Sequence, residues 1–218
     1  MRKAKKSKSE SVKNKVILIG APNTGKSTFF NKITNGTAAV SNIDRLTVSD
    51  ASAKLNKHKD ITIIDLPGLY NLSHPIDEEL VVAHEIAEEQ FSKIVNVIGA
   101  QSIERDLYLT IQAIESGLMS TLVINMIDEV DRSQVDVNKL SKALNDIDII
   151  ECQANRNIGT KKAIDSILNS KTVNPNLFKY PDYIENLISK ISNLLSVRKI
   201  SSRYYSLMIL EQNNFIID

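Results

Sequence analysis

Eight residues near the N-terminus have the types and the spacing of a loop that binds phosphate. Residues 20–27 read Gly-Ala-Pro-Asn-Thr-Gly-Lys-Ser and satisfy the pattern G-x-x-x-x-G-K-[ST]. Glycines let backbone N–H groups turn toward phosphate oxygens, and the helix that follows adds the positive end of its dipole. We expect Lys26 to reach the β- and γ-phosphates and the Ser27 hydroxyl to bind Mg²⁺. The expected contacts of this loop are Gly20, Ala21, Pro22, Asn23, Thr24, Gly25, Lys26, Ser27 and Thr28.

Further residues are expected to complete the phosphate and magnesium site. Asp65 ends an apolar run and begins Asp-Leu-Pro-Gly, so its carboxylate can contact Mg²⁺ through water while Gly68 offers its N–H to the γ-phosphate. Thr47 closes the irregular stretch 35–46, and a threonine there can close over Mg²⁺ and the γ-phosphate. Thr34 and Thr37 are nearby alternatives for that role. The predicted magnesium set is therefore Ser27, Thr47 and Asp65.

Two later segments are expected to recognise the base. Asp128, in Asn-Met-Ile-Asp at 125–128, can accept hydrogen bonds from the guanine N1–H and exocyclic amine. Adenine has no matching donor pair and would leave a buried carboxylate unpaired, which makes an ATPase the least favoured alternative. We expect the Ala154 amide to meet guanine O6. The expected base-side contacts are Asn125, Met126, Asp128, Gln153, Ala154 and Asn155.

Short apolar runs alternate with helical stretches along most of the chain, and these elements must position the motifs. The patterns predict strands at 16–19, 48–55, 61–65, 94–98, 120–125 and 147–151, with a polar link at 56–60. They predict helices at 26–34, 77–90, 104–116, 133–144 and 160–168. This alternation indicates a mainly parallel, doubly wound α/β sheet with functional loops at the carboxyl ends of its strands.

The two ends of the chain differ from this pattern. Residues 2–15 carry seven basic residues and one acid, which favours a solvated, disordered tail over contact with anionic lipid. After residue 170 a linker precedes apolar residues at helical spacing over 184–195 and a further helix at 201–211. We therefore expect a tail at 1–14, a nucleotide-binding domain at 15–170, and a linker with a small helical subdomain at 171–218.

Composition narrows the class of protein. The net charge of +1 gives no general support for nucleic-acid binding, and the single cysteine excludes an internal disulfide. Apolar runs fall short of the ~18 residues that cross a bilayer, and the N-terminus lacks a secretory pattern. We expect a cytoplasmic location.

The segments between the motifs resemble the FeoB-type family of ferrous-iron transporters, among the translation-factor-like GTPases. Residues 65–72 read Asp-Leu-Pro-Gly-Leu-Tyr-Asn-Leu and precede the acidic run at 77–79. Residues 103–112 read Ile-Glu-Arg-Asp-Leu-Tyr-Leu-Thr-Ile-Gln, against Leu-Glu-Arg-Asn-Leu-Tyr-Leu-Thr-Leu-Gln in the family. Met126, at a position where most GTPases carry Lys, is also typical of this family. The likeness covers about residues 15–168, and residues 204–211 are similar to the end of the family's helical regulatory domain.

The resemblance implies a Ras-like P-loop GTPase with six or seven strands and a small C-terminal helical subdomain. It implies slow GTP hydrolysis and a role in ferrous-iron transport, with a membrane transporter domain in the same or a partner chain. The location would then be the cytoplasmic face of the membrane. It also implies that Asn23 helps hold K⁺, so that the catalytic set is Lys26, Thr47, Gly68 and Asn23. Leu69 follows the family in lacking a water-orienting glutamine.

The sequence departs from the family pattern in four places. Residues 42–47 read Asn-Ile-Asp-Arg-Leu-Thr instead of Asn-Trp-Pro-Gly-Val-Thr, and Ala21 replaces a usual Asn. Gly99 stands where an acid is usual, and Gln153-Ala154 replaces Ser-Ala. Two alternatives remain open: a nucleotide sensor with negligible turnover, and a stand-alone GTPase linked to RNA or the ribosome. A weak homo-oligomer is a further expectation.

Overall fold

The computed structural model describes residues 15–36, 39–40, 51–72, 91–131, 135–176, 178–195 and 200–211. Three features predicted from the sequence lie outside these ranges. They are the basic tail, the loop that carries Thr47, and the helix at 77–90.

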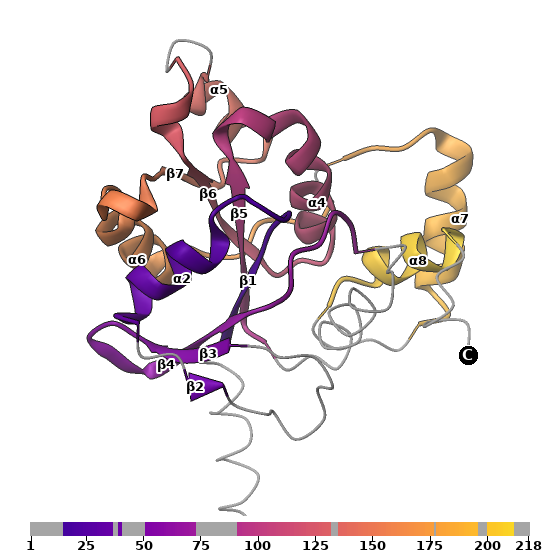
Figure 1. Cartoon of the computed structure of the whole chain (residues 1–218). Coiled ribbons are helices and arrows are strands. Elements are labelled where there is room, and N and C mark those ends of the chain that lie inside the picture. Colours follow the sequence, from indigo (N-terminus) through magenta and orange to yellow (C-terminus); the bar gives the residue numbers. More distant parts are fainter. Residues whose placement is uncertain are drawn as a thin grey trace, which may run out of the picture.

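A seven-stranded sheet forms the centre of the protein (Figure 1). Its strands lie in the order β2-β3-β4-β1-β5-β6-β7, and every neighbouring pair is parallel except β2–β3 and β3–β4. The mainly parallel sheet expected from the sequence is confirmed. The strand bounds are β1 Lys15–Ile19, β2 Ala39–Val40, β3 Ala51–Leu55, β4 His58–Asp65, β5 Lys93–Gly99, β6 Met119–Asn125 and β7 Asp148–Glu151.

The predicted polar link at 56–60 is wrong. Leu55 pairs directly with His58, so only Asn56 and Lys57 form the turn, and Lys57 has the left-handed φ of 63° that a tight turn requires. β4 therefore begins at His58. Its first residues are polar because that end of the strand is largely exposed, which hid the strand from an apolar pattern.

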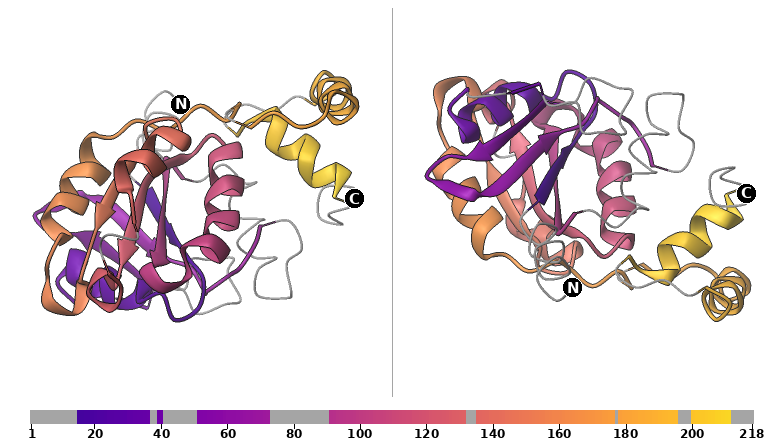
Figure 2. Two further views of the ribbon diagram at one scale, coloured as in Figure 1. Left: turned by 90° about the horizontal axis from the view of Figure 1, so that it is seen from above. Right: turned by 90° about the horizontal axis from the view of Figure 1, so that it is seen from below.

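Helices cover both faces of the sheet (Figure 2). Alternate β1 residues point to opposite faces: Val16 and Leu18 pack against α2 and α6, whereas Ile17 and Ile19 belong to the cluster that contains α4. The helix bounds are α2 Lys26–Thr34, α4 Ile103–Glu115, α5 Val137–Ala143, α6 Thr160–Asn169, α7 Asp182–Ser192 and α8 Ser202–Leu210. Short 3₁₀ turns are η1 Ala100–Ser102, η2 Ile127–Glu129 and η4 Ala154–Arg156.

The predicted start of the helix at 133 differs from the structure, in which α5 begins at Val137. Asp136 is the reason, because its carboxylate accepts the Lys139 N–H at 2.9 Å and so caps the helix at that point. Residues 132–134 lie outside the described part of the chain.

α7 and α8 pack on each other, and α8 also packs on the core of the sheet. Tyr204, Tyr205 and Met208 belong to the same apolar cluster as α4. Of the α7 side chains only Ile188 is buried, whereas Leu187 is exposed. The three-part division at residues 14 and 170 stays a prediction.

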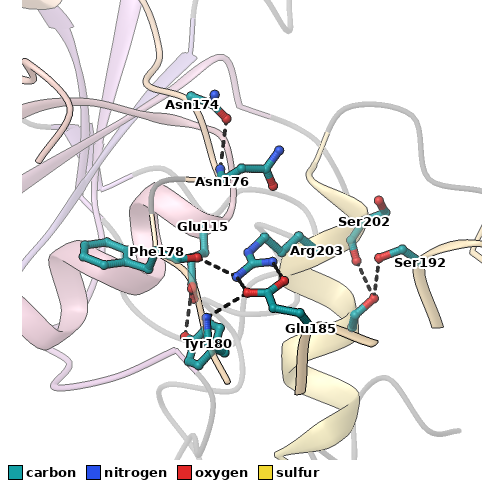
Figure 3. A network of polar contacts seen from close by, with 10 residues as sticks. Glu115, Asn174, Asn176, Phe178, Tyr180, Glu185, Ser192, Ser202 and Arg203 are labelled. Carbon is teal, nitrogen blue, oxygen red and sulfur yellow. Dashed lines mark hydrogen bonds and ion pairs between the residues drawn. The ribbon is translucent and has the colours of Figure 1, made fainter. Parts of the chain in front are cut away.

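A polar network ties this helical part to the end of α4 (Figure 3). Arg203 donates two hydrogen bonds to the Glu185 carboxylate, at 2.7 and 2.8 Å, and a third to the Phe178 carbonyl. The Tyr180 hydroxyl donates to Glu115 Oε1 at 2.8 Å. The hydrogen bonds from Arg203 lower the pKa of Glu185 to about 2, whereas burial raises the pKa of Glu115 above its usual range.

Within the described residues, every helix falls short of the length and apolar character that crossing a membrane requires.

Candidate functional site

The loop between β1 and α2 has a backbone shape that depends on glycine. Gly25 has a left-handed φ of 76°, and an added Cβ would lie 2.3 Å from Asn125 Nδ2. Thr24 is buried and donates its hydroxyl to the Ala21 carbonyl at 2.9 Å, which tightens the turn. α2 begins at Lys26, directly after the loop. The structure therefore has the predicted strand–loop–helix arrangement.

Lys26 and Asp65 meet at the carboxyl ends of two adjacent strands. β1 and β4 are parallel neighbours, so the residues that follow them come together at one edge of the sheet. The buried Lys26 ammonium donates to Asp65 Oδ1 and to the Leu66 carbonyl. Two groups that the sequence assigned to phosphate and to Mg²⁺ are thus in direct contact.

A pocket of about 320 Å³ opens beside this ion pair. Lys26, Ser27, Asp65 and Gly68 line it, and Ser27 and Gly68 are exposed. Its side-chain donors are the Lys26 ammonium and the Ser27 hydroxyl, and its one acid, Asp65, is bonded to that ammonium. This set fits a phosphate with a bound divalent cation. A larger cavity of about 820 Å³ lies between the start of α4 and α5, and its lining holds none of the predicted site residues.

The segment 66–72 lies against the phosphate loop. Leu66 donates its N–H to Leu18 O at 3.3 Å, and Leu69 donates its N–H to Gly20 O at 3.1 Å. A Cβ on Gly68 would lie 3.1 Å from Pro22 N, so a side chain at this position would push the phosphate loop away slightly. The Leu69 side chain is fully buried in the core and faces away from solvent.

Asn125 joins the phosphate loop to the predicted base-binding turn. Its Nδ2 donates to the Thr24 carbonyl and its Oδ1 accepts the Ala154 N–H, both at 3.0 Å. Asn125 therefore braces the two loops. The Ala154 amide, which we expected to face guanine O6, is directed at Asn125 in this structure, so O6 would have to share or replace that acceptor.

The other base-side residues surround this brace. Met126 has a left-handed φ of 59°, and its Cε lies 3.1 Å from where a Cβ on Gly25 would be, so its side chain packs against the phosphate loop. Asp128 lies in η2 and is exposed, as is Asn155 in η4. Gln153 is buried, and its Oε1 has no hydrogen-bond partner among the described residues. Burial raises the pKa of the adjacent Cys152 thiol to about 12, so it is a neutral packing group.

Three predicted site residues remain: two are exposed, and one lies outside the part of the chain that the structure describes. Asn23, with a φ of 67°, and Thr28 are exposed beside the phosphate loop. Thr47 lies outside the described residues. Two contacts could not be predicted from the motifs: the Leu66 carbonyl, which any residue would supply, and Gln112, whose Oε1 accepts the Leu72 N–H at 2.7 Å. Only the family-like segment at 103–112 drew attention to Gln112.

The turn after β5 is held by a buried acid from the first turn of α4. Asp106 is buried, and its Oδ2 accepts the Gly99 N–H at 3.2 Å and the Ser102 hydroxyl at 2.6 Å. A carboxylate thus contacts the turn although residue 99 itself is glycine.

Comparison with protein families and curated proteins gives consistent matches. The family described as ferrous iron transport protein B matches residues 14–167. The chain is 34% identical over 179 residues to the Fe(2+) transporter FeoB of Synechocystis sp., covering 81% of this chain and 29% of that protein. It is 34% identical over 212 residues to a Fe(2+) transport protein A/Fe(2+) transporter FeoB fusion protein of Porphyromonas gingivalis, covering 90% of this chain and 25% of that protein. The chain thus spans less than a third of these relatives.

Solved structures agree with these matches over nearly the whole chain. A mutant of S. thermophilus NFeoB bound to GDP superimposes with a TM-score of 0.85 at 32% identity, over 94% of this chain and 81% of that one. Another mutant of the same protein, bound to GMPPNP, gives a TM-score of 0.80 at 33% identity, over 94% and 82%.

Proposed function

This chain belongs to the family of ferrous iron transport protein B, FeoB, and on that premise we propose that it is a G domain that binds guanine nucleotides and hydrolyses GTP slowly. The observation that carries the proposal is the pocket where Lys26, Ser27, Asp65 and Gly68 converge. The solved relatives bound to GDP and to GMPPNP support the choice of nucleotide.

Each residue of the pocket has a distinct role in this proposal. Lys26 leaves Asp65 and binds the β- and γ-phosphates, while the N–H groups of residues 20–27 surround the α- and β-phosphates. Ser27 and Thr47 would hold Mg²⁺, with Asp65 reaching it through a water, and the ion would supply positive charge to the phosphates. Gly68 directs its N–H at the γ-phosphate, so that the segment 66–72 senses whether a third phosphate is present.

The residue at position 69, a leucine, is the reason to expect slow GTP hydrolysis. A polar side chain there could orient the attacking water, but Leu69 is buried in the core and cannot reach it. The same observation favours the second candidate function, a nucleotide sensor with negligible turnover. Asn23 would contribute by holding K⁺ near the developing charge on the phosphates.

Release of phosphate from GTP over hours separates the two functions. The wild-type protein is expected to release phosphate at a measurable rate, and Lys26→Ala is expected to lose about a hundredfold in GTP affinity and the hydrolysis with it. A thermal melt of the variant controls for folding, because the substitution leaves Asp65 without its cation. Binding of GTP without phosphate release would establish the sensor, and absence of guanine-nucleotide binding would sink both functions.

Exchanging sodium for potassium tests the role of Asn23. Hydrolysis by the wild-type protein is expected to be faster in potassium, and Asn23→Ala is expected to remove the difference while binding GDP as before. Asn23 is exposed, so this variant should fold normally. Equal rates in the two salts would refute the potassium site.

We further propose that this domain regulates ferrous-iron transport across a membrane. Support comes from the names of the curated relatives and from the match with their amino-acid sequence. A membrane transporter domain, in the same chain or a partner, would receive the movement of the segment 66–72. The domain would then work at the cytoplasmic face of that membrane.

A further inference from the structure

α4 contacts the segment 66–72 at two points. The Leu72 N–H donates to Gln112 Oε1 at 2.7 Å, and both residues are buried. The Arg105 guanidinium lies 5.3 Å from the centre of the Tyr70 ring, within the range of a cation–π contact. Arg105 and Gln112 are seven residues apart, two helical turns, so they project from the same side of α4. One face of this helix therefore contacts the second half of the segment.

The first half of the segment is held from the other side. Leu66 and Leu69 donate their N–H groups to Leu18 and Gly20, so β1 and the phosphate loop fix that half. Gly68 lies between these two anchors, and the contacts with α4 begin directly after the second one, at Tyr70. Because α4 packs against β5, the parallel neighbour of β1, its side chains are fixed relative to the phosphate loop. The anchor at Leu69 is therefore followed at once by a stretch that α4 holds, and through this anchor α4 can affect the direction of the Gly68 N–H.

We propose that Gln112 is a positioning residue for GTP hydrolysis, assisted by Arg105, and that it acts by holding the segment that carries Gly68. This inference rests on the proposed GTPase function. Gln112 is not among the residues that line the pocket at Lys26 and Asp65, so its effect passes through Leu72. Because GDP has no γ-phosphate for Gly68 to meet, the hydrolysis step depends on Gln112 and GDP affinity does not.

A pair of substitutions at one position separates this role from simple packing. Gln112→Met keeps the length of the side chain but removes the acceptor, and it is expected to lower the single-turnover rate of GTP hydrolysis about tenfold. Gln112→Glu keeps an acceptor oxygen in either protonation state and is expected to retain most of the rate. GDP affinity should stay within about twofold of wild type in both variants. Glu104→Gln, on an exposed position of the same helix, is the control.

A fluorescent reporter follows the segment without relying on hydrolysis. The chain contains no tryptophan, so Tyr70→Trp introduces a single one next to Arg105. In this background Gln112→Met is expected to increase quenching of the GDP-bound protein by acrylamide, whereas Gln112→Glu is not. Each comparison is made within the Tyr70→Trp background.

Each outcome decides the inference. Equal hydrolysis rates for Gln112→Met and Gln112→Glu, with GTP hydrolysis intact in the wild type, would overturn the positioning role and leave the GTPase function standing. If the wild type does not hydrolyse GTP, the proposed GTPase function is wrong. Equal acrylamide quenching of the two Gln112 variants would then overturn the positioning role as well. If Gln112→Met does not fold, Arg105→Gln takes its place as the test, because Arg105 is half-exposed. This variant should hydrolyse GTP about twofold to threefold more slowly than the wild type. An unchanged rate would refute the inference.

Discussion

Asp128→Asn is expected to change the preferred nucleotide from GTP to xanthosine triphosphate. In the proposed site the carboxylate would accept from the guanine N1–H and exocyclic amine, whereas an amide would place its own NH₂ against that amine. Xanthine has a carbonyl in place of the amine and pairs with the amide. Since a site built around a hydrogen-bonding group rejects the mismatched ligand strongly, GTP affinity should fall about a hundredfold or more.

Competition against a fluorescent guanine nucleotide measures both affinities. Glu129→Gln is the matched control, because Glu129 is the next residue, is also exposed, and lies in the same 3₁₀ turn. Its GTP affinity should remain that of the wild type. An Asp128→Asn variant that still binds GTP as tightly as before would show that the base is recognised elsewhere.

Gly25→Ala is expected to abolish tight binding of both GTP and GDP. The new Cβ would lie 2.3 Å from Asn125 Nδ2, and Asn125 can move away only by releasing the Thr24 carbonyl and the Ala154 N–H. The left-handed φ adds strain of about 1–2 kcal/mol. We expect a loss of about a hundredfold in affinity for either nucleotide, together with a lower melting temperature.

Gly36→Ala is a control that separates strain from collision. Gly36, just beyond the other end of α2, has a similar φ of 64°, but an added Cβ there meets nothing within 4 Å. This variant should lose about 1 kcal/mol of stability and keep its nucleotide affinity. If both alanine variants bind GDP as the wild type does, the close contact between Gly25 and Asn125 does not shape the site. Isothermal titration with GDP and a thermal melt give both quantities.

The sequence predicted the site correctly where a local pattern of residues determines the structure. The loop at 20–27 and the carboxylate at 65 follow apolar strands, and parallel strands bring such residues to one edge. The link of the hairpin was predicted too long, at 56–60 instead of 56–57, because the exposed end of β4 carries polar residues that resemble a loop. The start of α5 was misplaced because the capping role of Asp136 outweighed the apolar periodicity around it.

Contacts between distant segments could not be predicted in the same way. The Ala154 amide points at Asn125 because of how η4 sits against α2 and β6, and a backbone donor leaves no trace in side-chain types. The contact between Asp106 and the Gly99 N–H is a second example, because nothing in the residue types at these two positions indicates that they meet.

The brace made by Asn125 also determines when a newly synthesised chain becomes able to bind nucleotide. Asn125 lies 101 positions after Thr24 and 29 before Ala154, so its two hydrogen bonds close long stretches of chain. A ribosome releases the N-terminus first, so the phosphate loop emerges well before its brace. Since β7 ends at Glu151, just before Ala154, the last strand emerges together with the last part of the brace. Nucleotide can therefore stabilise the finished domain but cannot assist the early steps of its folding during translation.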